Sequence, residues 1–246
     1  MKMDCIIPLK LSKTNCFLVK HSNGYLLVDC GYEKDKSLFE KTLKKSGVKY
    51  DEITHLLLTH HHDDHAGLLT HIVEKNPNIK VVAHKNAFEL LKIGVNDETH
   101  GGGIINRRIH FLCRLYKLIN REWTLSFPPY KKRSQDVEIL GDSDYLRRLG
   151  INADIIYTPG HSIDHISLIF DNGLVLAGDA AMNWLNWAGS RNVVLYVNNI
   201  NQYYESWRKL IKKNAQTIYP AHGNAFNVAS LKKNMDFYRN ATLIPF

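Results

Sequence analysis

Short apolar runs alternate with longer amphipathic stretches along most of the chain. The runs at 4–9, 16–20 and 25–29 predict strands, and Ser22-Asn23-Gly24 predicts the hairpin turn between the last two. Further strands are predicted at 55–58, 81–83, 153–157, 166–170, 174–176 and 217–219. Apolar residues at helical spacing predict helices at 34–45, 66–74, 86–93, 202–212 and 228–238. This interleaving predicts an α/β protein in which helices flank the sheets.

The most informative polar segment follows the apolar run 55–58. It reads Thr59-His60-His61-His62-Asp63-Asp64-His65-Ala66-Gly67 and holds four candidate metal ligands: His60, His62, Asp64 and His65. Side chains two residues apart on an extended segment point the same way, so His60 and His62 can bind one ion together. Asp64 and His65 lie where a helix is predicted to begin and can face a second ion.

Three more predicted strands end at residues of the same chemical kind. The strand 153–157 leads to His161, the strand 174–176 leads to Asp179, and the strand 217–219 leads to His222. A rigid sheet can hold side chains from several strand ends in fixed positions. This recurrence favours a metal site over a solvated, His-rich loop. Because the set has nitrogen and oxygen donors and no thiolate, zinc is the first choice and iron or manganese stay open.

These segments resemble the five motifs of the metallo-β-lactamase fold superfamily. Asp29 matches the first motif, His60–His65 the second, and His161, Asp179 and His222 the third, fourth and fifth. The resemblance implies a four-layer αβ/βα sandwich with two mixed sheets flanked by helices. It implies that one ion is bound by His60, His62 and His161, that a second is bound by Asp64, His65 and His222, and that Asp179 bridges both. Asp29 would orient a ligand without binding metal.

The same resemblance implies a binuclear metal-dependent hydrolase whose nucleophile is a metal-bridging hydroxide. The proton of the leaving group would be carried by Asp64 or by a metal-bound water. Departures from subfamily patterns bear on the substrate. The β-lactamases carry Cys or Ser at the fourth motif, where this chain has Asp179, and the lactonases typically carry a catalytic Tyr where this chain has Met182. Glyoxalase II enzymes share the sequence of the second motif but add a C-terminal helical domain. Here 24 residues follow His222, enough for about one or two helices.

We therefore expect a carboxylic ester, thioester or lactone as substrate. Two alternatives stay open: a phosphodiesterase or nuclease of the same fold, and a mononuclear-iron redox enzyme similar to the persulfide dioxygenases. A net charge of +8 is compatible with anionic substrates, but the sequence contains no recognised nucleic-acid module, so nucleic acid is not the expected partner.

The segment 99–133 lies between the second and third motifs and has three interpretations. Five residues at helical spacing predict a helix: Ile105, Ile109, Leu112, Tyr116 and Ile119. That helix could pack on the sandwich, form a lid or pocket wall over the site, or contact a second copy of the chain or a membrane surface. Trp184, Trp187 and Tyr196 are candidate pocket aromatics, and His165 is a candidate support for the site.

Length and composition favour a single domain spanning 1–246. Hydrophobic residues make up 44% of the chain, enough for a substantial core, and no linker or repeat divides it. No stretch is long and apolar enough to be a signal peptide or a membrane span, which favours a cytoplasmic location. The four cysteines show no C-x-x-C spacing and are expected to be unpaired thiols.

Overall fold

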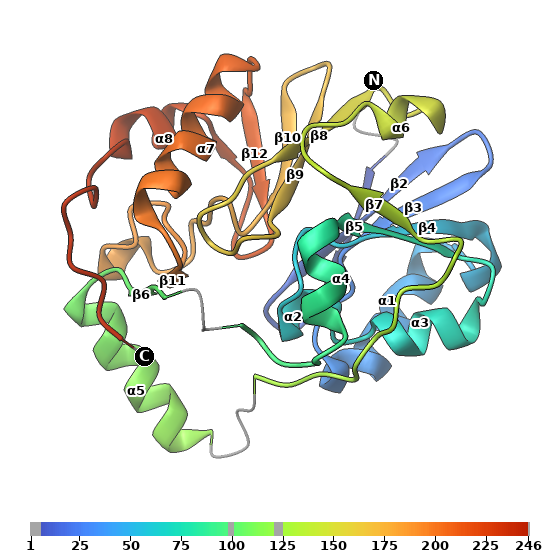
Figure 1. Ribbon diagram of the computed structural model, residues 1–246, viewed down its shortest axis with the longest axis horizontal. Helices are drawn as coiled ribbons and strands as arrows, with labels where there is room; N and C mark the ends of the chain where they lie inside the picture. The colour runs from blue at the N-terminus through green and yellow to red at the C-terminus, as the bar shows by residue number, and fades with distance from the viewer. Residues whose placement is uncertain (1–5, 98–100, 121–124, 246) are drawn as a thin grey trace.

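Two β-sheets face each other at the centre of the molecule, and helices cover their outer faces (Figure 1). The computed structural model describes residues 6–97, 101–120 and 125–245. One sheet has six strands in the order β1-β2-β3-β4-β5-β7, and the other has five in the order β13-β12-β10-β9-β8. Strands β6 and β11 form a separate two-stranded ribbon. The predicted four-layer αβ/βα sandwich is confirmed.

The strands are short. Their bounds are β1 (Ile6–Lys10), β2 (Asn15–His21), β3 (Gly24–Val28), β4 (Ile53–Leu57), β5 (Lys80–His84), β6 (Gly103–Ile104), β7 (Val137–Ile139), β8 (Ala153–Tyr157), β9 (Ile166–Phe170), β10 (Leu174–Gly178), β11 (Tyr196–Val197), β12 (Thr217–Pro220) and β13 (Phe226–Asn227). The α-helices are α1 (Lys36–Ser46), α2 (Asp63–Ala66), α3 (Leu69–Lys75), α4 (Lys85–Leu91), α5 (Arg107–Ile119), α6 (Tyr145–Arg148), α7 (Ile200–Lys212) and α8 (Ala229–Asn234). Short 3-10 helices are η2 (Glu33–Asp35), η3 (Tyr50–Glu52) and η4 (Asn186–Ala188).

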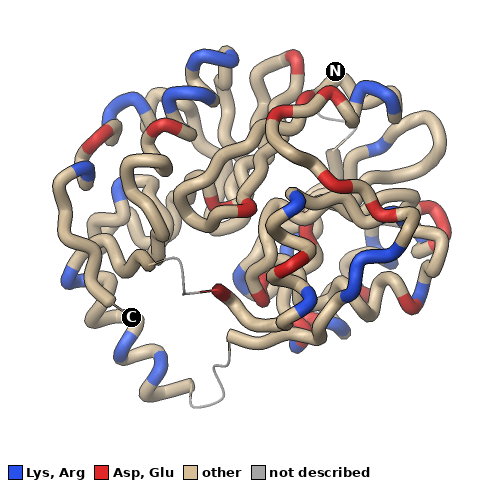
Figure 2. The backbone as a smooth tube through the Cα atoms, viewed as in Figure 1, with Lys and Arg blue, Asp and Glu red and all other residues tan. Residues whose placement is uncertain are grey.

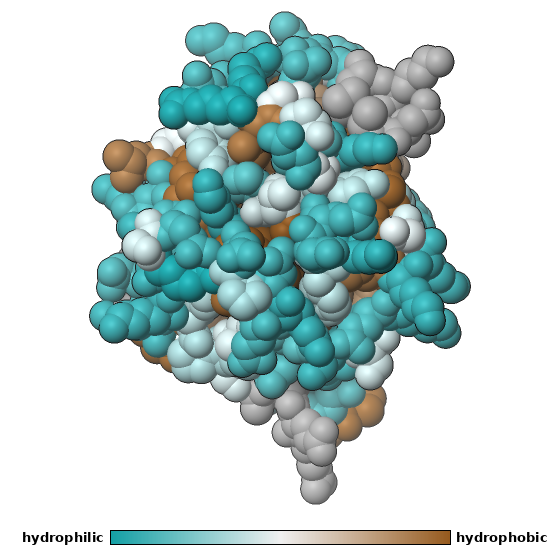
Figure 3. All heavy atoms as spheres, turned by 90° about the vertical axis from the view of Figure 1, so that its right-hand side faces the viewer, coloured by the Kyte–Doolittle hydropathy of each residue, from teal (hydrophilic) through white to brown (hydrophobic). Residues whose placement is uncertain are grey.

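Three apolar layers hold the sandwich together. The first lies between the six-stranded sheet and α1, α3 and α4; the second lies between the two sheets. The third lies between the five-stranded sheet and α5, α7 and α8. Successive side chains of a strand point to opposite faces of its sheet, so one strand contributes to two apolar layers. In β4, Leu56 packs toward the helices and Leu57 toward the other sheet. Figure 3 shows the side of the molecule that carries β2, β3 and α3 covered mainly by hydrophilic groups.

The sheet topology places the ends of several strands at one edge. Strands β3, β4, β5 and β7 pair in parallel, so their carboxyl ends lie together. In the other sheet β10 pairs in parallel with β12, and β9 runs antiparallel to both β8 and β10. The carboxyl ends of β8, β10 and β12 therefore also share an edge. These two edges carry the loops that hold the candidate ligands.

Two predicted helices differ from the structure. The predicted helix 66–74 is divided into α2 and α3 at Gly67, where a side chain would lie 2.4 Å from the backbone nitrogen of Glu33. The chain approaches the backbone of Glu33 so closely there that only glycine fits, a tertiary contact that helical spacing does not predict. The predicted helix 228–238 is shorter, because the backbone of Met235 turns to an extended conformation after α8.

The segment 99–133 contains the predicted helix as α5, which lies beside the five-stranded half of the molecule (Figure 1). Thr99 and His100, the first two residues of that segment, and residues 121–124 lie outside the described residues. In the described part of the chain, no helix is both long and apolar enough to cross a bilayer.

Candidate metal centre

The loop after β4 directs its side chains alternately toward and away from the site. His60 and His62 both point toward His161, while His61 turns back to Asp164, whose carboxylate accepts from the His61 backbone N–H at 2.8 Å. The His61 ring lies 3.1 Å from the same carboxylate. The second-motif loop is therefore tied to the loop that carries His161.

Three imidazole rings converge at the first group of candidate ligands. The Nε2 atom of His161 lies 3.0 Å from Nε2 of His60 and 3.0 Å from Nδ1 of His62. All three residues are buried. A proton shared between two of these nitrogens cannot satisfy the third, whereas one cation between them would accept a lone pair from each.

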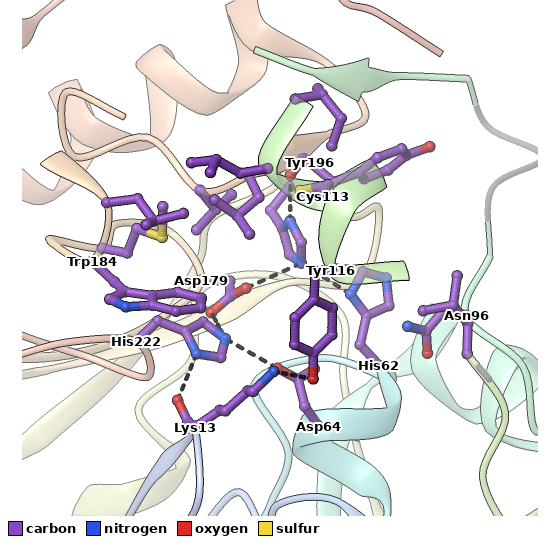
Figure 4. A pocket seen from close by; sticks show the side chains of 18 of the residues that line it. Lys13, His62, Asp64, Asn96, Cys113, Tyr116, Asp179, Trp184, Tyr196 and His222 are labelled. Carbon is purple, nitrogen blue, oxygen red and sulfur yellow. Dashed lines mark hydrogen bonds and ion pairs between the residues drawn. The ribbon is translucent and has the colours of Figure 1, made fainter. Parts of the chain in front are cut away.

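A second group contains carboxylates as well as imidazoles. His222 Nε2 lies 3.0 Å from Oδ2 of Asp64 and 3.3 Å from Oδ1 of Asp179. His65 belongs to the same group, within 4.8 Å of Asp64 and His222 through its ligand atom. The other Asp179 oxygen, Oδ2, lies 3.5 Å from His161 Nε2. One carboxylate thus faces both groups, as Figure 4 shows.

Unsatisfied polar atoms show that these residues fit a cation. His65 Nε2 and Asp179 Oδ1 are fully buried, have no hydrogen-bond partner, and lie 3.5 Å apart. Leaving such atoms unpaired costs about 1 to 3 kcal/mol each. A divalent ion would satisfy both, and the nitrogen and oxygen donor set suits zinc, iron or manganese.

The ring nitrogens that face away from the site are held by acceptors from other parts of the chain. His65 Nδ1 lies 2.8 Å from Asp29, His161 Nδ1 lies 2.9 Å from the Tyr196 carbonyl, and His222 Nδ1 lies 2.9 Å from the Lys13 carbonyl. Such acceptors fix the tautomer so that the opposite nitrogen presents its lone pair to the site.

Asp29 connects the carboxyl ends of β3 and β4. Its carboxylate accepts from the backbone N–H of Thr59 at 2.8 Å and from the Thr59 hydroxyl at 2.9 Å, as well as contacting His65. The residue adopts a left-handed backbone with φ 59°, which Asp tolerates better than most residues. The carboxylate therefore holds the start of the second-motif loop and one imidazole together.

His165, whose role the sequence left open, contacts the backbone of Asp179. The Asp179 N–H donates to His165 Nε2 at 2.9 Å, and the hydroxyl of Tyr203 donates to the Asp179 carbonyl at 3.0 Å. Burial, with a contribution from His161, lowers the pKa of His165 to about 3, so the ring is neutral and can accept. Tyr203 was not expected at the site, because its sequence position marks only a buried helix face.

The electrostatic surroundings differ between the two groups. Burial, followed by neighbouring histidines, lowers the pKa of His60 and His62 well below the usual value, so both rings are neutral and have free lone pairs. Burial opposes protonation of His222 too, but Asp179 and Asp64 outweigh it and raise its pKa to about 9. A divalent ion in the second group would therefore displace protons as it binds.

A cavity of about 430 Å³ opens in front of the ligands. The aromatic residues proposed from the sequence, Trp184, Trp187 and Tyr196, all line it. Lys13 and Tyr116 line it as well, and the Lys13 ammonium donates to the Tyr116 hydroxyl (Figure 4). The helical spacing gave a signal for Tyr116. Nothing in the sequence around Lys13 separates it from an ordinary surface lysine.

An αβ/βα sandwich with two groups of candidate metal ligands at one edge indicates the class of protein, and comparison with known families agrees. The family model described as the metallo-beta-lactamase superfamily matches residues 9–222. The chain belongs to this superfamily, whose members are largely hydrolytic metalloenzymes.

Several curated proteins are similar over most of this chain. The lactamase-like protein adaB of Aspergillus niger is 24% identical over 216 residues, covering 87% of this chain and 51% of that protein. The beta-lactamase-like protein 2 homolog of Drosophila melanogaster is 24% identical, covering 88% and 60%. An atrochrysone carboxyl ACP thioesterase of Pseudocercospora fijiensis is 24% identical, covering 87% and 48%. The chain thus spans roughly half the length of the curated relatives it matches.

Solved structures agree on the fold. A metallo-beta-lactamase from Cronobacter sakazakii superposes with a TM-score of 0.61 at 16% identity, covering 89% of this chain and 75% of that one. An archaeal superfamily protein from Sulfolobus tokodaii gives a TM-score of 0.61 at 17% identity, covering 98% and 88%.

Proposed function

We propose that the protein is a binuclear metal-dependent hydrolase of carboxylic esters, thioesters or lactones, with thioesters first. The observation that carries the proposal is the Asp179 carboxylate, whose two oxygens face separate groups of donors. His60, His62 and His161 would hold one ion, and Asp64, His65 and His222 the other, with Asp179 shared. Zinc is the proposed metal in both positions.

The bound ions would supply an activated water at neutral pH and polarise the scissile carbonyl. The chain's own groups fix the geometry: Asp29 and the Lys13 carbonyl orient His65 and His222, and His165 holds the Asp179 backbone. Asp64, which contacts His222 and faces the cavity, is the proposed carrier of the leaving-group proton.

Two observations support the substrate class. The relatives include proteins named atrochrysone carboxyl ACP thioesterases, at 24% and 22% identity, so thioester chemistry occurs among similar sequences. Asp179 occupies the position where the β-lactamases of the superfamily carry Cys or Ser, which disfavours a β-lactam substrate. The proposed partner is a small molecule. A cytoplasmic location is also proposed, because Cys16, Cys30 and Cys113 are free buried thiols.

The test combines metal content with a substrate panel. Elemental mass spectrometry of protein purified without added metal should give two zinc ions per chain, and the protein should hydrolyse acyl thioesters, p-nitrophenyl esters or lactones. Asp64→Asn and His60→Ala should each abolish turnover while circular dichroism stays unchanged. Near-normal activity of either variant at saturating metal would refute the binuclear mechanism. A single iron would favour redox chemistry, and cleavage of bis(p-nitrophenyl) phosphate alone would favour a phosphodiesterase.

A further inference from the structure

The cavity beside the ligands has two kinds of wall. Its charged lining residues belong to the ligand groups and the segments next to them: Lys13, Asp63, Asp64, Asp97 and Asp179, with the ligand histidines. The other lining residues carry no charge, and most of them come from α5 and from the segment 182–196. Tyr32, Asn96, Ile104 and Leu125 contribute from elsewhere in the chain. A molecule in the cavity therefore meets polar groups on one side and apolar groups on the other.

Helix α5 presents a separate apolar face to the cavity. Ile109 and Cys113 pack into the apolar layer of the five-stranded half and anchor the helix. Leu112, Leu115 and Ile119 follow the helical spacing of a neighbouring face and line the cavity. Leu115 is 43% exposed and Ile119 72% exposed, so folding does not bury them. Large apolar side chains left open beside a candidate active site favour a binding role.

The basic residues of α5 do not line the cavity. Arg107, Arg108, Arg114 and Lys117 are exposed, and none of them belongs to its lining. Figure 2 shows the basic positions of α5 along its tube. A phosphate or sugar-phosphate group against the apolar wall would lose hydration without gaining a partner. An apolar group would gain free energy from the area it buries there.

A second wall of the cavity is the loop that carries Trp184 and Trp187, which hydrogen bonds within the loop and from Asn106 hold in place. Trp184 and Trp187 are 45% and 74% exposed and line the cavity. The hydroxyl of Ser190 lies within hydrogen-bond distance of two acceptors, the Trp184 carbonyl at 3.1 Å and the Asn186 side-chain oxygen at 2.6 Å. The indole rings are therefore carried by a backbone that these contacts hold.

We propose that this cavity binds an apolar, straight-chain acyl group, which lies between α5 and the Trp184–Trp187 loop with its scissile carbonyl at the ligand end. This inference rests on the proposed function and specifies its substrate class: medium-chain acyl thioesters or esters. A volume of about 430 Å³ falls in the range of pockets that enclose small ligands, roughly 300 to 1,000 Å³. The thiol or alcohol part of the substrate would extend through the open mouth.

The binding test uses the product acids as probes. Calorimetric titration of the purified protein as isolated with hexanoate, octanoate, decanoate and dodecanoate, below micellar concentration, should show affinity rising about threefold to fourfold per added methylene. The carboxylate is the same in every member of this series. Any contact that it makes with the candidate metal ligands therefore does not affect the change in affinity per methylene. A flat series would overturn the inference.

Helix α5 offers a matched pair of variants. Ile119 and Leu118 are adjacent and equally exposed, at 72% and 73%, but only Ile119 lines the cavity. Ile119→Ser should weaken decanoate binding roughly fivefold and reduce the increase of affinity with acyl chain length. Leu118→Ser should bind decanoate with the affinity of the wild-type protein. Equal losses in both variants would indicate adsorption on the helix surface and would refute the cavity site.

Kinetics separate this inference from the proposed function. For a series of acyl thioesters, kcat/KM should rise with chain length, and Ile119→Ser should reduce that rise more than it affects the acetyl thioester. If short thioesters are hydrolysed with no preference for longer ones, the hydrolase stands and the acyl site fails. If the acids bind with the expected slope but no ester, thioester or lactone is hydrolysed, the acyl site stands and the proposed reaction fails.

Discussion

Asp29 shows how one side chain can control a site without lying in the cavity. It accepts hydrogen bonds from the Thr59 N–H and hydroxyl and contacts the Nδ1 atom of His65, and it is buried. The negative charge holds the His65 ring in the tautomer whose Nε2 faces the site. The same carboxylate fixes the point at which the loop leaves β4. Loss of its charge should therefore affect ligand orientation more than folding.

Asp29→Asn tests this role, because Asn preserves the shape and tolerates the left-handed backbone at φ 59°. We expect metal affinity to fall by roughly 10- to 100-fold. Competition against a chromogenic zinc chelator measures this change directly. Asp171→Asn is the control, since Asp171 is paired with Arg147 on the surface. Equal affinities of the Asp29 and Asp171 variants would show that the Asp29 charge does not act on the ligands.

His55 makes stability depend on pH through burial. The residue lies on β4, its Nε2 atom has no hydrogen-bond partner, and burial together with His21 and Lys80 lowers its pKa to about 4. Because the unfolded chain binds this proton near pH 6.5, acid favours unfolding between pH 6.5 and about 4. Above pH 6.5 the residue is neutral in both states and adds no further dependence.

His55→Phe should reduce that pH dependence. The substitution keeps a ring against Tyr145 and removes the titrating group. Acidification across this interval should lower the unfolding free energy of both proteins. We expect the loss to be about 2 kcal/mol smaller in the variant than in the wild-type protein. Urea unfolding at several pH values provides the measurement. His110→Phe, at a partly exposed position, is the control; parallel pH profiles for all three proteins would contradict the argument.

At the scale of single elements, the carboxyl ends of strands deliver most of the site. His60 to His65 follow β4, and β8, β10 and β12 lead to His161, Asp179 and His222 respectively. Strands β4, β10 and β12 are paired on both sides and β8 is paired with β9 at the edge of its sheet, so the loops leave strands that the sheets hold in place. Helix α5 contributes no candidate ligand. One of its faces packs into the apolar layer over the five-stranded sheet, and another forms a wall of the cavity.

The packing face of α5 should account for its contribution to stability. Ile109→Ala removes a fully buried side chain from the apolar layer and should lower the unfolding free energy by about 2 to 5 kcal/mol. Leu118→Ala, at a position 73% exposed, should change it by about 0.5 kcal/mol or less. Denaturant unfolding followed by circular dichroism compares the two. Similar effects of both substitutions would show that α5 is not anchored through Ile109.

Local sequence patterns and the motif resemblance singled out the candidate ligands, with Asp29 and His165 as candidate supports, but they did not predict the long-range contacts around them. His60, His62 and their partners could be found because each follows an apolar strand at a fixed short distance. The pairing of Lys13 with Tyr116 joins residues 103 positions apart, and the contact of His161 with the Tyr196 carbonyl spans 35. Contacts of this range depend on how loops close in space, which neither periodicity nor motif spacing encodes. The break at Gly67 was missed for the same reason.

At the scale of the whole molecule, the candidate site joins the two sheets. His60, His62, Asp64 and His65 follow a strand of the six-stranded sheet, whereas His161, Asp179 and His222 follow strands of the five-stranded sheet. Each proposed ion would take ligands from both. Metal binding would then stabilise the packing of one sheet against the other, in addition to any role in catalysis.

Metal removal should therefore lower the melting temperature. If free zinc exceeds the dissociation constant by about 1,000-fold, bound metal stabilises the folded state by about 4 kcal/mol, equivalent to roughly 10 °C for a chain of this length. Calorimetry before and after dialysis against a chelator gives the shift, and added zinc should restore it. His161→Ala removes the histidine that the five-stranded sheet contributes to the first group, so the melting temperature of this variant should respond less to zinc. A chelator-insensitive melting temperature in a protein shown to have lost its metal would mean that the ions do not hold the two sheets together.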